Sequence, residues 1–145
     1  MGDRRADAVS PRATGGCLCG SISFSLFGNL RDVSYCHCLM CQRALSHYGA
    51  FTACDPESLV IVDPLRKLRW YQSSPEARRG FCSRCGSQLF WDPAHGRHMS
   101  VSAGSLDQPT GLGPGRHIHL DHVADHDRDA LAPVPPGGSR LIAGA

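Results

Sequence analysis

The stretch CSRCG at residues 82–86 is typical of a zinc knuckle, in which a tight turn brings two cysteine thiolates to one metal ion. Gly86 follows the second cysteine and permits a left-handed backbone, which lets amide N–H groups point at the sulfurs. A second cysteine pair elsewhere makes such a motif a strong zinc signal, and CLC at residues 17–19 supplies that pair. We expect Cys17 and Cys19 to enter the first strand, where residues i and i+2 face the same side and reach one ion.

A third element, CHCLMC at residues 36–41, places Cys36, Cys38 and Cys41 close together in the chain. Three sulfurs can converge there on one ion with no help from a distant segment. A three-cysteine zinc site leaves the fourth tetrahedral position for water or a substrate, as catalytic zinc sites do. The element therefore predicts an open metal site.

Spacing alone leaves two ways to divide the eight cysteines. In the first, a closed four-thiolate site is formed by Cys17, Cys19, Cys82 and Cys85. An open three-thiolate site is then formed by Cys36, Cys38 and Cys41. The second makes a single zinc ribbon and leaves spare thiols, the ribbon being formed by Cys38, Cys41, Cys82 and Cys85. We prefer the first partition because it uses seven of the eight cysteines and leaves only Cys54 unassigned.

The open site has a competing interpretation, in which a histidine closes it as a second structural site. His47 is the better candidate, since the strand neighbours of His37 point that side chain the other way. Cys54 is expected to be a buried small hydrophobic residue rather than a ligand.

The composition favours a metal-stabilised protein of the cytoplasm. The 145 residues suit one domain, but aromatics are only 7% of them, so metal is expected to add stability that packing cannot supply. The first residues show no apolar segment typical of a signal peptide, and no stretch reaches transmembrane length, so no membrane contact is expected. Reducing compartments keep thiols free, which favours metal over disulfides. A net charge of +2 without a basic stripe argues against nucleic acid as a partner.

Short strands separated by turns are predicted along the middle of the chain, at residues 21–27, 59–62, 88–91, 99–102 and 117–123. With 16 glycines and 10 prolines, the expected fold class is mainly β, with small antiparallel sheets around zinc sites and few or no long helices. His117 and His119 share a face of the last strand with Asp121, which we interpret as a solvated or hydrogen-bonded face.

The predicted organisation has three parts. A flexible leader covers residues 1–13, a single zinc-binding β domain covers 14–132, and a Pro/Gly-rich tail covers 133–145.

The cysteine elements and their flanks resemble the glutathione-dependent formaldehyde-activating enzyme family, which also contains centromere protein V. The resemblance rests on GGCLCG at residues 15–20, YCHCLMCQR at 35–43 and RGFCSRCGSQLFW at 79–91, all in the family's order. AGSLD at residues 103–107 and HI at 117–118 extend it, so that it covers roughly residues 14–123.

The resemblance implies a mainly β fold and two Zn²⁺ per chain, bound by the cysteine groups of the first partition. The structural zinc then belongs to Cys17, Cys19, Cys82 and Cys85, and the catalytic zinc to Cys36, Cys38 and Cys41. The implied activity is that of a carbon–sulfur lyase, which reversibly joins glutathione and formaldehyde as S-hydroxymethylglutathione. Glutathione or a similar small thiol is then the partner. Five arginines are candidates to hold its carboxylates and are otherwise surface charges: Arg43, Arg66, Arg69, Arg78 and Arg79.

Two other functions fit the same cysteines. One is a zinc-stabilised binding module without catalysis, and the other is a redox or metal-buffering protein that uses the three-cysteine site. Dependence of a reaction rate on substrate separates the enzyme from both.

The preferred partition predicts two zinc ions per fully loaded chain, because each cysteine group is large enough to hold one ion. Elemental analysis of the zinc-saturated, dialysed protein should return two equivalents. A value of one equivalent would indicate the single-ribbon partition instead.

Overall fold

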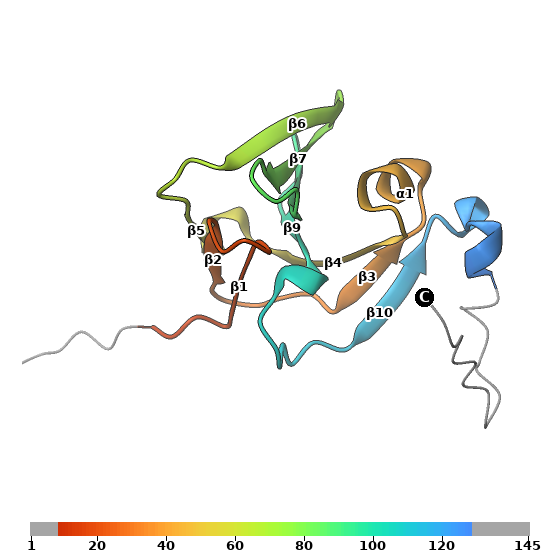
Figure 1. Ribbon diagram of the computed structural model, residues 1–145. Coiled ribbons are helices and arrows are strands. Elements are labelled where there is room, and N and C mark those ends of the chain that lie inside the picture. The colour runs from red at the N-terminus through yellow and green to blue at the C-terminus, as the bar shows by residue number, and fades with distance from the viewer. Residues whose placement is uncertain (1–8, 129–145) are drawn as a thin grey trace, which may run out of the picture.

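The computed structural model describes residues 9–128 as two β-sheets with one short α-helix (Figure 1). A three-stranded antiparallel sheet has the order β1-β2-β5, formed by Ala13–Gly16, Ser23–Leu26 and Leu59–Val62. A seven-stranded sheet has the order β10-β3-β4-β9-β8-β7-β6. In chain order, its strands are β3 Val33–Cys36, β4 Gly49–Cys54, β6 Leu68–Ser74, β7 Ala77–Cys82, β8 Gln88–Pro93, β9 Met99–Ser102 and β10 Pro114–Ile118. The mainly β fold class is confirmed.

One strand pair departs from the antiparallel pattern. β10 runs parallel to β3, with His117 opposite Tyr35 and Ile118 opposite Cys36. The two strands lie side by side at one end of the large sheet, while β6 and β7 stand at the other end (Figure 1). A late segment of the chain therefore lies beside the strand that leads into the three-cysteine element.

The helix α1 (Leu39–Leu45) is separated by two residues from the end of β3 at Cys36, and its C-cap is Ser46, whose φ of 59° is left-handed. Four 3₁₀ turns accompany it: η1 Pro56–Ser58, η2 Ala103–Ser105, η3 Leu120–His122 and η4 Asp125–Asp127. Among residues 9–128, no helix has both the length and the apolar character needed to cross a membrane.

Four of the five predicted strands are present. Residues 59–62 and 99–102 are strands with the predicted bounds, and β2 and β8 overlap the predictions at 21–27 and 88–91. The fifth prediction, 117–123, is wrong. β10 ends at Ile118 because His119 has a left-handed φ of 57° and η3 follows at once, so His117 and His119 do not share a strand face.

Most residues of the predicted leader and all residues of the predicted tail lie outside the described part of the chain. Residues 1–8 and the whole of 133–145 lie outside the described part of the chain. Within it, Ala13 already begins β1, and the backbone N–H of Arg12 donates to the carbonyl of Leu26 at 2.7 Å.

The main core joins the two sheets. Phe24 of β2 meets Phe90 of β8 edge to face, with ring centroids 5.3 Å apart. Leu26, Leu89 and Val101 are fully buried in the same cluster. Burying an aromatic or aliphatic side chain contributes roughly 1.5–3 kcal/mol, so this contact is a principal link between the sheets.

Gly15→Ala tests how closely β1 is packed. A Cβ at Gly15 would collide with the carbonyl oxygen of Ser105 and lie 2.6 Å from the Phe24 ring, and neither backbone nor core can yield easily. We expect a loss of about 1–3 kcal/mol in unfolding free energy, measured by denaturant titration of the metal-loaded protein. Gly104→Ala is the control, because a Cβ there meets nothing within 4 Å. Equal stability of the two variants would contradict the packing of β1.

Candidate metal centres

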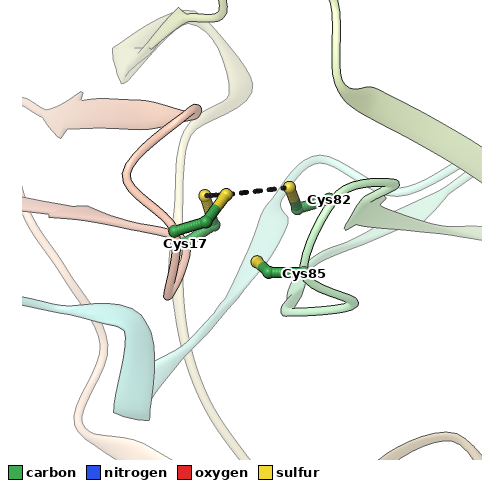
Figure 2. Close-up of side chains that lie close together, drawn as sticks. Cys17, Cys82 and Cys85 are labelled. Carbon is green, nitrogen blue, oxygen red and sulfur yellow. Dashed lines mark hydrogen bonds between the residues drawn. The ribbon is translucent and has the colours of Figure 1, made fainter.

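The first cysteine cluster joins two turns that are far apart in the sequence. The sulfurs of Cys17, Cys19, Cys82 and Cys85 all lie within 4.8 Å of one another. Figure 2 shows Cys17 facing Cys82 and Cys85 across the gap between their two loops. The sulfur of Cys19 is 3.6 Å from that of Cys17 and 3.8 Å from that of Cys82.

Tight turns, not strand alternation, bring these sulfurs together. Cys17 and Cys19 follow β1 in the turn that leads to β2, and the N–H of Gly20 donates to the carbonyl of Cys17 at 3.1 Å. The expectation that they lie on a strand is therefore wrong. Cys82 ends β7 and Cys85 lies in the following turn, where Gly86 has the predicted left-handed φ of 79°. Both loops bend sharply, which lets side chains two and three residues apart face one point.

The spacing and the chemistry of the four sulfurs fit a zinc ion. Four sulfurs held tetrahedrally about 2.3 Å from one ion lie about 3.8 Å apart, close to the 3.6 and 3.8 Å that separate the sulfur of Cys19 from those of Cys17 and Cys82. Hydrogen bonds from Ser87 lower the pKa of Cys85 to about 5, while burial raises the pKa of Cys82 to about 11. A thiolate beside three further thiols is a soft donor set that suits zinc.

The second cluster forms where β3 meets α1. The sulfurs of Cys36, Cys38 and Cys41 lie within 4.8 Å of one another. Cys36 is the last residue of β3, and Cys38 caps α1, its sulfur accepting the N–H of Cys41 at 3.4 Å. The helix was not predicted, because its seven residues are too short for a periodic pattern. It turns Cys41 back toward the end of β3.

A buried arginine contacts this cluster. Arg79 of β7 is 6% exposed, and its Nη2 lies 3.6 Å from the sulfur of Cys41. Hydrogen bonds from the Cys36 thiol and from Arg79 lower the pKa of Cys41 to about 5, and the same bond to Cys41 raises the pKa of Cys36. Three cysteine thiolates with one neighbouring cation fit a divalent ion with an open coordination position.

The candidate closing histidines lie elsewhere. The Nε2 of His47 is 3.3 Å from a carboxylate oxygen of Asp127, and neither His47 nor His37 belongs to the three-sulfur group. His37 is fully buried, and its Nε2 lies 2.8 Å from Nδ1 of His117, which stacks on Tyr35. These imidazoles link β3 to β10.

A second link fixes the backbone of the three-cysteine element. The N–H of His37 donates to the carbonyl of Ile118 at 3.0 Å. The side-chain amide of Gln42 donates to the carbonyls of His37 at 2.7 Å and His122 at 2.6 Å. The segment after β10 thus holds the loop that carries Cys36 and Cys38.

The three cysteines border a cavity of about 350 Å³, a size within the range of small-molecule sites. Phe51, Trp91 and Ile118 form apolar parts of its wall, and Arg31, Arg79, His98 and His119 provide polar groups. Sequence reasoning missed Arg31, Phe51, Trp91 and His98, since nothing in their local pattern points to the cysteines. It had named Arg79 only as one of five equivalent arginines.

A larger hollow of about 900 Å³ lies over the β1–β2 turn and η2. Its wall is rich in glycine and serine and contains none of the three cysteines of the second cluster. Within residues 9–128, the smaller cavity combines neighbouring thiols with a buried arginine and apolar walls, which makes it the candidate site.

The fold and the two clusters define a small β protein with two cysteine groups suited to metal ions. The sequence model of the family described as glutathione-dependent formaldehyde-activating enzyme matches residues 12–122. The chain therefore belongs to that family, and the resemblance drawn from its motifs is confirmed.

Two individual proteins are also similar. An uncharacterized lyase of Schizosaccharomyces pombe is 30% identical over 89 residues, which is 61% of this chain and 63% of that protein. The crystal structure of a Rhodobacter sphaeroides protein shares the fold, with a TM-score of 0.58 at 23% identity, over 72% of this chain and 98% of that one.

The two clusters should respond differently to loss of one sulfur. We expect Cys85→Ser to unfold the domain, because the four-thiol cluster joins the β1–β2 and β7–β8 turns, and a bound structural zinc contributes to folding free energy. Cys38→Ser should keep the native fold, since strand pairing and Gln42 hold its loop. Circular dichroism and thermal melting of the zinc-loaded variants test this.

Cys54→Ala is the matched control, because Cys54 is buried in the core and belongs to neither cluster. Burial raises the pKa of its thiol to about 11, as suits an inert core residue. Equal loss of structure in Cys38→Ser and Cys85→Ser would argue against separate roles for the clusters.

Proposed function

We propose that this chain is a zinc-dependent carbon–sulfur lyase acting on S-hydroxymethylglutathione, the adduct of glutathione and formaldehyde, or on a related thiol adduct. The supporting observation is the three-cysteine cluster, which borders a cavity with one buried arginine and apolar walls. Family membership and the name of the yeast relative support the same class of reaction. The Cys17, Cys19, Cys82 and Cys85 group is proposed as the structural site, and two Zn²⁺ per chain are proposed in all.

Cys36, Cys38 and Cys41 would hold the catalytic zinc. When bound, the ion supplies a Lewis acid with an open position, which lowers the pKa of a thiol that enters the cavity.

Arg79 counters the negative charge that three cysteine thiolates bring to a largely buried site. Its guanidinium donates to Cys41 and has no aspartate or glutamate beside it in the cavity wall. An uncompensated buried cation is costly, so the thiolates and Arg79 stabilise each other. The cation also favours entry of an anionic thiol.

The cavity walls position the two reactants. Phe51, Trp91 and Ile118 exclude water from one side of the cluster, which limits hydration of the aldehyde. In the lyase direction, the hydroxyl of the adduct loses its proton, its carbon becomes a carbonyl, and the electron pair of the C–S bond stays on sulfur. His98 and His119 lie in the same wall and are the candidate proton acceptors for this step.

Exchange NMR on an equilibrium mixture of glutathione and formaldehyde tests the activity. The zinc-loaded protein should raise the exchange rate above the uncatalysed rate, because the cavity brings thiol and aldehyde together. Cys38→Ser should return the rate to the uncatalysed value, whereas Cys54→Ala should keep it. If zinc-replete protein fails to accelerate exchange, this substrate pair is rejected and related thiol adducts come next.

A further inference from the structure

A second cavity of about 450 Å³ lies beside the three-cysteine cavity, and the two share Met40 and Arg79 in their walls. Residues of α1 form one side of the second cavity, and Tyr71 and Ser73 of β6 contribute to the wall. A ligand with its sulfur at the cysteines can therefore extend across Met40 into this second space.

Exposed apolar side chains surround the second cavity. Leu39 is 60% exposed, Met40 50% and Tyr71 65%, although all three border the same hollow. Apolar groups gathered at a concave surface with a few polar groups are typical of ligand sites. The body of a bound ligand would cover them.

Arginines are the permanently charged residues in the walls of both cavities. Arg79 is shared by the two walls, Arg43 borders the second cavity, and neither wall contains an aspartate or glutamate. Within residues 9–128, neither arginine forms a salt bridge, whereas Arg78 binds Asp92 at 2.7 Å. Arginine side chains left without acidic partners in a hollow suit a carboxylate ligand.

We propose that the second cavity binds the carboxylate-bearing body of the thiol substrate, with Arg43 as its anchor and Arg79 between the two parts of the site. The preferred ligand is therefore an anionic, peptide-sized thiol that spans both cavities. This inference rests on the proposed function, because it takes the three cysteines as the place where the sulfur binds.

Two ligands of similar size and equal thiol content test the role of charge. Glutathione carries free carboxylates, and glutathione diethyl ester carries none. Protein loaded with Co²⁺ reports thiol binding through its visible absorption spectrum, independently of turnover. The dissociation constants of both thiols are measured for the wild type, Arg43→Ala and Arg69→Ala.

Arg69→Ala is the matched control. Arg69 lies on β6, the strand that carries Tyr71, but it borders neither cavity and its side chain donates to the carbonyls of Arg66 and Leu68. Both substitutions remove one positive charge, but only Arg43→Ala removes it from the wall of the second cavity.

We expect the wild type to prefer glutathione over the ester, and Arg43→Ala to reduce that preference about threefold to fivefold, the worth of one partly exposed ion pair. Arg69→Ala should keep the wild-type preference. An unchanged preference in Arg43→Ala, or an equal fall in both variants, would overturn this inference and leave the proposed function standing. If no thiol changes the cobalt spectrum of the wild type, the proposed function fails and this inference with it.

Discussion

The convergence of four cysteine sulfurs between the two sheets is the constraint on which the rest of the structure depends. Cys17 and Cys19 come from the turn of the small sheet, and Cys82 and Cys85 from the β7–β8 turn of the large one. The contact of Phe24 with Phe90 joins the same sheets within the core. The chain has few aromatic residues to pack between the sheets, so a metal ion at this junction would add stability that packing alone does not supply.

The three-cysteine element depends on that arrangement, because its surroundings come from the large sheet. β10 lies parallel to β3 and supplies the Ile118 carbonyl that holds His37, while β7 brings Arg79 to Cys41. Strand pairing and the two hydrogen bonds of Gln42 therefore hold the loop. A site with such support can leave one coordination position open for chemistry without loss of the loop's shape.

The fold was predictable where short strands alternate or form apolar runs. Residues 59–62 and 99–102 are strands with the predicted bounds, since their residues suit a partly or fully buried strand. The predicted extension of the last strand to residue 123 was wrong. The strand ends before His119, whose left-handed φ no local sequence pattern predicts. The parallel pairing of β10 with β3 could not be predicted from the sequence either, since it depends on where a segment late in the chain packs.

For the candidate sites, the sequence by itself determined which thiols lie close along the chain: a CxC, a CxxC and the group at Cys36, Cys38 and Cys41. The short chain segments between these cysteines limit how far their sulfurs can separate, so the local sequence alone predicts that the sulfurs of each element lie close together. Only the tertiary structure decided that the first two elements meet, and that Arg79, Trp91 and Ile118 border the third. Those residues belong to different strands, and strand pairing, not sequence spacing, sets which side chains share a cavity.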